Sequence, residues 1–422
     1  MMATATFANS TIAGSPVRVA SKAPSRLFLM LVGATIALSS VVFFEPAPVD
    51  AMVLGCLLLG VLSGILKFSG MRPAPVILLT IFVIANLVSL YDPIDGKRAT
   101  WYIFVTVYLC LSWAFFVSFL GTYGQRGLRT IIDWYTVAAI FCMTLGLLSY
   151  FHIIGHQSFL LLYGRPKGTF KDPNVYGPYM VPVALFALAG LVGRARGRKS
   201  VIMNGVIFFV LSAGLVMSFS RACWINFAVS LASYITFLYL LRPAHTPPPV
   251  PVWKAVLLMG LGTLALGGVL ELPAVKVMMD KRVTSNGLQS YDRDRFRTQR
   301  LAMDAAEARP LGIGPGQAEL AFDYATHSSY MRVLSENGWI GEFAYVAFIL
   351  VSLGRALWMG CTTRDPFWKK IFFISAACIL GHMVNSGVVD TVHWRHYWLL
   401  LALPWYSPGQ APERGQALIE VG

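Results

Sequence analysis

A histidine in a polar stretch is the side chain of this sequence best suited to proton transfer. His327 opens the run His327-Ser-Ser-Tyr330, shortly before a long apolar segment. Its unperturbed pKa near 6.5 makes an imidazole the natural general base at neutral pH. A single histidine in such a loop is more often structural than catalytic, so its role depends on its surroundings. No second histidine or carboxylate lies at metal-ligand spacing, and we predict neither a metal nor a cofactor.

Basic residues also occur in a turn-rich segment upstream. The stretch from Gly164 to Asn174 contains Arg165 and Lys167, and it ends in Asp172-Pro-Asn, which favours a turn. One interpretation is a surface turn whose cations contact the phosphates of membrane lipids. The other is recognition of a lipid-linked phosphate group.

Arginines gather at one tight turn and along one predicted helix. Arg221 follows Ser-Phe-Ser between two apolar runs, where it either snorkels to the membrane surface or grips a phosphate. On the predicted amphipathic helix 293–308, Arg297 and Arg300 belong to a cationic face, whereas Arg295 projects elsewhere. A solvated helix face is the alternative for this strip. Guanidinium groups suit phosphate because their planar donors bind two oxygens at once.

Membrane-spanning helices must position these segments. Of the 422 residues, 56% are hydrophobic and only 13% are charged, whereas soluble domains have about 25% charged residues. A bilayer core requires roughly 20 apolar residues in a helix. The apolar runs that fit this requirement, with the second and last of them short, are 27–44, 51–66, 74–91, 101–120, 130–151, 175–193, 200–218, 222–241, 252–271, 338–357, 371–389 and 395–406. We therefore predict about twelve spans.

The distribution of lysine and arginine predicts the orientation. With the N-terminus inside, eighteen of these residues fall in inner segments and seven in short outer segments. The remaining nine lie in the long loop 272–337, and loops of that length escape the positive-inside rule. Both termini, 1–26 and 407–422, are thus predicted to be cytoplasmic tails. Nine spans then lie within 27–271 and three within 338–406. The net charge of +14 follows from these cytoplasmic loops, and we expect no nucleic-acid binding.

Together these segments resemble the O-antigen ligase family, which includes bacterial lipopolysaccharide O-antigen ligases and related polysaccharide polymerases. The family pattern is a His, then Asn, Ser or Gln, nine residues, Gly, two residues, and Gly, Thr or Tyr. His327-Ser328 with Gly338 and Gly341 fits this pattern fully. The Ser-Arg pair that ends at Arg221 also matches the family.

The resemblance extends to the segment before the histidine. Family members have an arginine some fifteen residues before a Pro-Leu-x-Gly-x-Gly turn, and Arg295 stands fifteen residues before Pro310. Arg297 instead fits an Arg-x-x-x-Leu pattern, and Arg300 is a third candidate, so the choice stays open. The glycine-rich turn itself has neither Walker A nor dinucleotide-binding spacing, and phosphate binding by its backbone is a weak signal.

The resemblance implies an all-α polytopic membrane protein of GT-C-like type in the bacterial inner (cytoplasmic) membrane, with the loop 272–337, containing short helices, in the periplasm. It implies an inverting, metal-independent glycosyltransferase of cell-surface polysaccharide biosynthesis. The donor is an undecaprenyl-diphosphate-linked glycan, and the acceptor is a hydroxyl of a glycan or of lipid A-core. Arg221 and Arg295 hold the diphosphate, and His327 deprotonates the acceptor. The residues expected to bind substrate are Arg165, Lys167, Asp172, Asn174, Arg297, Arg300 and Tyr330.

Two questions about function stay open at this point. A ligase and a polymerase share donor and chemistry and differ in acceptor, and the sequence does not separate them. From another class, twelve spans also fit a secondary transporter. Transporters place ionisable groups near the bilayer midplane, whereas here Asp133 lies near the end of its span and the other ionisable residues crowd the outer face.

Overall fold

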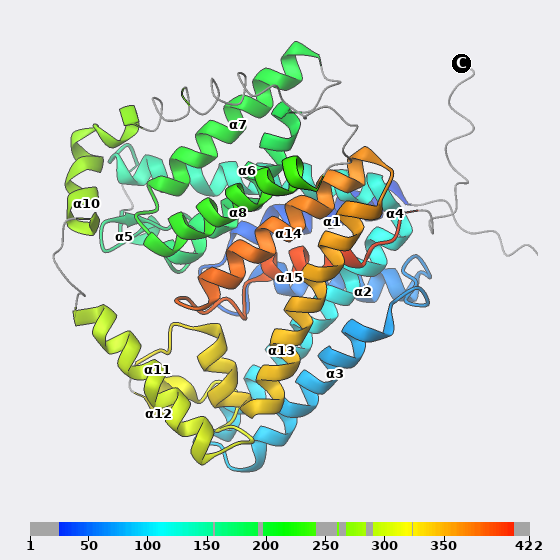
Figure 1. The fold of residues 1–422 in the computed structure, drawn as a ribbon, viewed down its shortest axis with the longest axis vertical. Coiled ribbons are helices and arrows are strands. Elements are labelled where there is room, and N and C mark those ends of the chain that lie inside the picture. Colours follow the sequence, from blue (N-terminus) through cyan, green and yellow to red (C-terminus); the bar gives the residue numbers. More distant parts are fainter. Residues whose placement is uncertain are drawn as a thin grey trace, which may run out of the picture.

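The computed structural model describes residues 25–154, 157–192, 197–241, 260, 267–283, 290–322 and 324–408. Within these ranges the chain is α-helical apart from one two-stranded sheet (Figure 1). Most of the predicted span 252–271 and most of the two predicted tails lie outside the described residues.

Helices of very different length follow one another along the chain. Up to the first long connection the elements are α1 (Arg26–Ala37), η1 (Leu38–Ser40), α2 (Pro48–Leu62), α3 (Pro73–Val88), η2 (Ser89–Tyr91) and α4 (Gly96–Tyr150). The next elements are α5 (Gln157–Leu160), β1 (Leu161–Leu162), β2 (Arg165–Pro166), α6 (Pro173–Val192), α7 (Arg198–Val216) and α8 (Arg221–Leu240). The last are α10 (Pro273–Val283), α11 (Ser290–Ala308), α12 (Ala318–Ala321), α13 (Ser329–Thr362), α14 (Pro366–Ser386), α15 (Arg395–Ala402) and η3 (Leu403–Trp405).

Seven helices in the described ranges are long and apolar enough to cross a membrane. Helix α4 has 55 residues and would measure about 83 Å if straight, far more than a bilayer core of about 30 Å. Its backbone leaves the helical conformation at Gly124, so it holds both predicted spans 101–120 and 130–151. Helices α1 and α2 are apolar but shorter, and α15 has only 8 residues. The predicted all-α polytopic class is confirmed, whereas the count of twelve spans stays a prediction.

Side-chain caps fix where two of the site-bearing helices begin. The first N–H groups of a helix have no partner within it, so a polar side chain just before the helix satisfies one of them. At the start of α4 the carboxylate of Asp95 accepts a hydrogen bond from the N–H of Arg98, at 3.1 Å. At the start of α13 the hydroxyl of Ser328 accepts one from the N–H of Met331. His327 therefore stands directly before a capped helix start.

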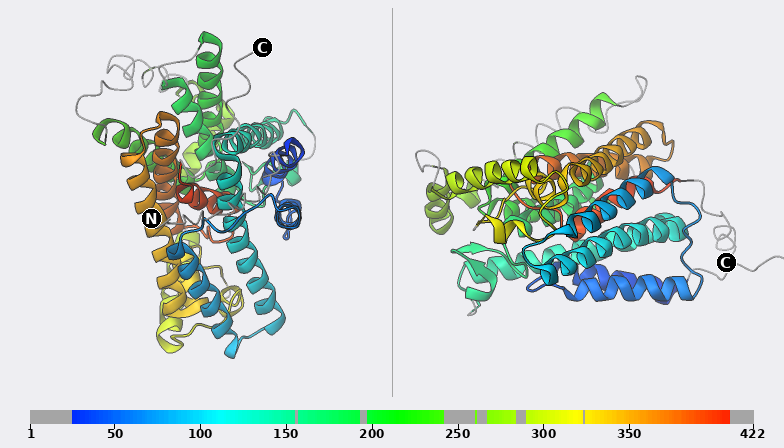
Figure 2. Two further views of the ribbon diagram at one scale, coloured as in Figure 1. Left: turned by 90° about the vertical axis from the view of Figure 1, so that its right-hand side faces the viewer. Right: turned by 90° about the horizontal axis from the view of Figure 1, so that it is seen from below.

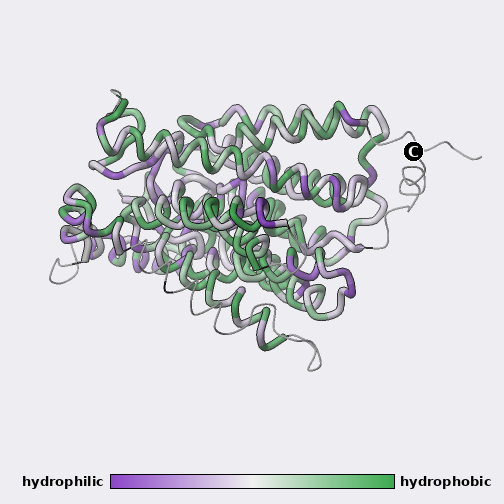
Figure 3. Tube along the Cα trace, turned by 90° about the horizontal axis from the view of Figure 1, so that it is seen from above, coloured by the Kyte–Doolittle hydropathy of each residue, from purple (hydrophilic) through white to green (hydrophobic). Residues whose placement is uncertain are grey.

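The long helices pack into one bundle. Helix α13 lies beside α3 and α14, and α14 lies beside α8 (Figure 1). The short helix α15 runs through the interior, where its residues from His396 to Ala402 are all buried (Figure 2). Hydrophobic residues predominate along the helices, and hydrophilic residues gather mainly at helix ends and in connections (Figure 3). This is the distribution expected of a bundle whose flanks face lipid.

Helix α13 is divided by a kink at Gly338, whose backbone has φ 68° and ψ −176°. The kink lies where the tenth span was predicted to begin. It leaves a first segment from Ser329 to Asn337 that is packed among the polar connections, with the apolar span after it. At this glycine an added Cβ would come within 2.2 Å of the carbonyl oxygen of Pro310.

We predict that Gly338→Ala destabilises the protein far more than Gly64→Ala does. Both glycines have a positive φ near 68°, but a Cβ at Gly64 would meet nothing within 4 Å. Gly64→Ala therefore exposes only the backbone strain, about 1–2 kcal/mol. Gly338→Ala adds a backbone clash and, because ψ at Gly338 is −176°, a conformation that essentially only glycine adopts; we expect the two together to cost about 1–3 kcal/mol more. Thermal unfolding of both purified variants measures the difference, and equal losses in Tm would contradict the packing role of Gly338.

Candidate functional site

The connection between α4 and α6 forms a small hairpin that ends in a helix cap. Strand β1 pairs with β2 in antiparallel register, so that Leu162 faces Arg165. Tyr163 and Gly164 between them have φ values of 51° and 72°, as the two central residues of a tight hairpin turn require. Further on, the carboxylate of Asp172 accepts a hydrogen bond from the N–H of Asn174 at 2.6 Å. This turn starts α6 and fixes both side chains at its N-terminal end.

The turn between α7 and α8 lies against this hairpin. Phe219 adopts a left-handed backbone with φ 50° and is buried, a conformation rare for a bulky residue. The hydroxyl of Ser220 caps α8 by accepting from the N–H of Cys223, and it donates to Asn174 Oδ1 at 2.7 Å. Arg221 is consequently the first residue of α8, with an exposed side chain. A cation is unfavourable at a helix N-terminus, whereas an anion bound there would meet both the helix dipole and the guanidinium.

Arg165 is the buried link between these two turns. Its Nε donates to the carbonyl oxygen of Ser218 at 3.2 Å, and its Nη2 donates to Asn174 Oδ1 at 3.3 Å. Only 8% of the residue is exposed. These two bonds assign Arg165 and Asn174 a structural task, the joining of the hairpin to the α7–α8 turn. Any contact with substrate at these two residues stays a prediction.

Helix α11 brings Arg295 into the same region. Burial lowers the pKa of this guanidinium, and the neighbouring charge of Arg221 acts in the same direction, while Tyr324 and Asp172 oppose them. These three partners and Arg295 itself come from four different segments of the chain. Arg295 is buried, whereas Arg297 and Arg300 on the same helix are exposed. Arg295, which helical spacing predicts to lie off the cationic face, is thus the arginine that turns inward.

His327 lies beside this cluster in a strained backbone conformation with φ 46°. Its ring packs against the ring of Tyr324, with 5.2 Å between the centroids. Burial lowers the pKa of the imidazole, and the charge of Arg295 lowers it further, against the weaker opposing effect of Asp172. The imidazole is therefore neutral near pH 7 and has a nitrogen lone pair that accepts a proton.

A glutamine fixes the spacing between α11 and the histidine loop. Nε2 of Gln299, one turn after Arg295, donates to the carbonyl oxygen of Thr326 at 3.2 Å and to that of Gly387 at 3.4 Å. Helix α11, the segment before His327 and the end of α14 are joined at this side chain. No sequence pattern singles out this residue.

Other predicted substrate-binding residues lie less directly in the cluster. The hydroxyl of Tyr330 donates to the carbonyl oxygen of Met383 at 2.8 Å, so it is engaged with α14. Lys167 is half-buried on the hairpin. Their roles toward a substrate, like those of Arg297 and Arg300, stay predictions.

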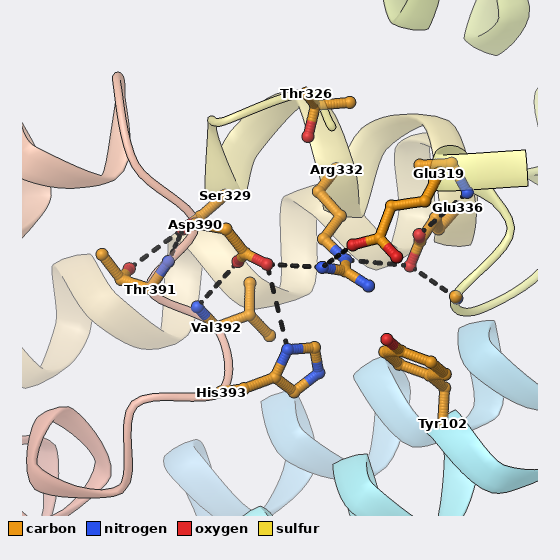
Figure 4. Close-up of polar contacts among 12 residues, drawn as sticks. Tyr102, Glu319, Thr326, Ser329, Arg332, Glu336, Asp390, Thr391, Val392 and His393 are labelled. Carbon is orange, nitrogen blue, oxygen red and sulfur yellow. Dashed lines mark hydrogen bonds and ion pairs between the residues drawn. The ribbon is translucent and has the colours of Figure 1, made fainter. Parts of the chain in front are cut away.

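A second polar cluster beside His327 centres on Arg332 (Figure 4). This buried guanidinium lies 2.5 Å from Asp390 Oδ2 and 3.3 Å from Glu336 Oε2, and its cation lies over the ring of Tyr102. Burial raises the pKa of the Asp390 carboxyl, but the charge of Arg332 outweighs it and holds that pKa below its ordinary value. Asp390 also acts electrostatically on His327. The two clusters are therefore adjacent.

Glu336 connects Arg332 to the glycine-rich turn. Its Oε2 accepts from the N–H of Gly316 at 2.8 Å, and its Oε1 accepts from the N–H of Ala318 at 3.1 Å. The N–H of Gly314 donates to the backbone oxygen of the same glutamate. These N–H groups already donate hydrogen bonds within the protein, so the turn serves packing and not phosphate binding.

Sequence reasoning missed this second cluster, although one signal was present. Arg332 and Glu336 are four residues apart at the start of a helix, a spacing that places opposite charges side by side. Asp390, Tyr102 and Tyr324 carry no such signal, because each reaches the site from a separate segment through tertiary packing.

The family model described as O-antigen ligase matches residues 206–346, about one third of the chain. The matched stretch contains Arg221, Arg295 and His327, and it ends shortly after Gly341. The predicted resemblance to this family is confirmed for this stretch. Comparison with curated proteins finds no match.

We predict that Glu336→Gln destabilises the protein strongly. The substitution leaves Arg332 without one of its two closest carboxylates, and breaking a buried ion pair typically costs about 3–5 kcal/mol. The matched control is Asp92→Asn, which breaks the exposed ion pair of Asp92 with Arg309, at 3.2 Å. An exposed pair is worth about 0–1 kcal/mol. Thermal unfolding measures both variants, and a Glu336→Gln protein as stable as Asp92→Asn would contradict the central place of the buried pair.

Proposed function

From the O-antigen ligase domain at residues 206–346, we propose that this chain transfers glycan from an undecaprenyl-diphosphate-linked donor to an acceptor hydroxyl at the periplasmic face of the bacterial inner membrane. Both termini are then cytoplasmic. The observation that carries the proposal is the convergence of Arg221, Arg295 and His327 from three separate segments into one electrostatic cluster. The reaction class, a glycosyltransferase of the ligase or polymerase type, follows from the family, and its finer description is ours.

The two arginines supply the electrostatics of the transfer. When the donor reacts, the bond between the anomeric carbon and the phosphate oxygen breaks, and negative charge builds on the departing diphosphate. Fixed guanidinium groups stabilise this charge more in the transition state than in the ground state. Arg295 is held for this task on α11, and Arg221 stands at the N-terminus of α8, where the backbone also favours an anion.

His327 supplies the proton acceptor. The neutral imidazole takes the proton of the acceptor hydroxyl as the oxygen attacks the anomeric carbon from the side opposite the diphosphate. The new carbon–oxygen bond forms as the old one breaks, so the configuration inverts. Undecaprenyl diphosphate leaves with the bonding electrons, and the proton later passes from His327 to solvent. Neither a metal nor a nucleotide takes part in this scheme.

The decisive comparison is between two arginines on the same helix. In liposomes with purified protein, lipid-linked glycan and an acceptor, we expect Arg295→Gln to lower kcat/KM by roughly 100-fold or more, as loss of one oxyanion donor does. Arg293→Gln, at an exposed position of the same helix, is the matched control, and we expect it to retain activity within about threefold.

The same assay contains the outcomes that contradict the proposal. Equal losses in the two variants would refute the assignment of Arg295. Transfer that stops in EDTA and returns with a divalent metal would refute the metal-independent mechanism. Uptake of a solute into the liposomes without any glycosyl transfer would identify a transporter.

The pH dependence of kcat/KM is a second prediction. Burial and Arg295 lower the pKa of His327, so its neutral form persists below the ordinary histidine pKa of about 6.5. We expect the acid limb of kcat/KM to lie below that pH, with activity lost as pH falls through the lowered pKa. In the residual activity of Arg295→Gln the limb moves to higher pH, because the repelling charge is gone, whereas Arg295→Lys leaves it nearly unmoved. An acid limb that is the same in both variants would contradict the electrostatic coupling between Arg295 and the base.

A further inference from the structure

A cavity of about 600 Å³ lies beside the hairpin that carries Arg165. Apart from Thr169, the residues that line it are apolar, and most of its wall is formed by Phe43, Phe141, Leu145, Ile154, Phe159 and Leu160. They come from the segment after η1, from the second half of α4, and from the connection between α4 and α6. A cavity of this size is typical of a ligand site.

The wall of this cavity is fixed by contacts within the protein. The rings of Phe43 and Phe159 stack with 4.1 Å between centroids. The N–H of Val42 donates to the carbonyl oxygen of Thr169. The hydroxyl of Thr169 donates to the carbonyl oxygen of Ser40 at 2.5 Å. The polar atoms of Thr169 are thus engaged within the wall, so the cavity presents carbon to its occupant. Such a cavity holds water poorly and favours an apolar guest.

The cavity opens on a side of the bundle that faces lipid. Phe141 and Phe159 on its rim are 49% and 53% exposed. Val137, one turn before Phe141 on α4, is 54% exposed, as expected of a residue on the lipid-facing side of a span. An apolar chain can therefore enter from the bilayer without crossing water.

The cavity and the cationic cluster share one loop. The carbonyl oxygen of Leu160, in the cavity wall, accepts hydrogen bonds from the N–H groups of Lys167 and Gly168 at 3.0 and 3.1 Å. Arg165 follows on the paired strand and reaches the turn that precedes Arg221. One loop therefore joins the apolar cavity on one side to the turn of Arg221, an exposed cation, on the other. The complementary ligand is an amphiphile with a phosphate head and an apolar tail.

We propose that this cavity seats the phosphate-proximal isoprenoid units of the lipid-linked donor, an assignment that rests on the proposed function. With the tail held there, the diphosphate stands on the hairpin side that leads to Arg221 and Arg295. The cavity thereby sets how far the donor reaches into the site.

The test is photo-crosslinking of a long-chain polyprenyl phosphate that carries a diazirine near its phosphate end, with the full-length protein in phospholipid liposomes. We expect crosslinks on α4 and on residues 157–169, and a loss of roughly tenfold or more in Leu145→Trp, which fills the cavity. Val137→Trp, on the same helix but outside the cavity, is the matched control and retains the crosslinks. Ile154→Trp fills the cavity from a connection, and it replaces Leu145→Trp if that variant does not fold.

Competition identifies the occupant. Excess unlabelled undecaprenyl phosphate removes the crosslinks, which form although the phospholipid of the bilayer is already in large excess over the probe. Crosslinks that persist in both filled variants, or that excess undecaprenyl phosphate leaves unchanged, overturn the assignment. This readout needs no glycosyl transfer. A protein that binds the chain here but transfers no glycan would overturn the proposed function and leave the cavity assignment standing.

Discussion

A single buried cation, Arg332, organises the polar end of this helical bundle. A guanidinium removed from water is tolerated only when carboxylates and hydrogen-bond acceptors surround it. The two closest carboxylates of Arg332 connect it to different segments. Asp390 lies in the connection after α14, and Glu336 accepts a hydrogen bond from the glycine-rich turn. Buried ion pairs add little net stability, but they penalise every packing in which the partners separate. The connections around His327 are therefore assembled in one arrangement because one charge must be neutralised.

The site next to this ion pair has the opposite electrostatic character. Arg221 and Arg295 act on each other as like charges. Among the residues that the structure describes, Asp172 is the carboxylate that acts against them at both Arg295 and His327. The rigid supports on either side, Gln299 on α11 and the Ser220 cap on α8, hold the cations in place. A site with excess positive charge, fixed by such supports, is preorganised for an anion and needs little rearrangement when one binds.

The features of the structure that depend on local sequence could be predicted. Apolar runs predict the spans, and the helix over 293–308 is found as α11 because its pattern has helical spacing. The inward direction of Arg295 also follows from that spacing. What could not be predicted depends on tertiary packing. No local pattern tells that Asp390 faces Arg332, that the glycine-rich turn spends its N–H groups on Glu336, or that Arg165 ties two turns together. Two separate spans, 101–120 and 130–151, are predicted where the structure has the single element α4. Only the change of backbone conformation at Gly124 divides this element into two spans.

Under the proposed function, the position of Arg295 beside His327 links binding of the donor to activation of the base. In the free protein the charge of Arg295 lowers the pKa of His327, which keeps the imidazole neutral but also weakens it as a proton acceptor. Under the proposed function, a diphosphate bound to Arg295 would compensate that charge, so that burial alone would still lower the pKa of His327 while the donor is in place. The imidazole is then a stronger base at the stage when the acceptor hydroxyl must lose its proton. The arginine that binds the leaving group would in this way also make the strength of the base depend on the presence of the donor. This coupling requires Arg295 and His327 to be held close together, and the hydrogen bonds of Gln299 to the histidine loop supply that constraint.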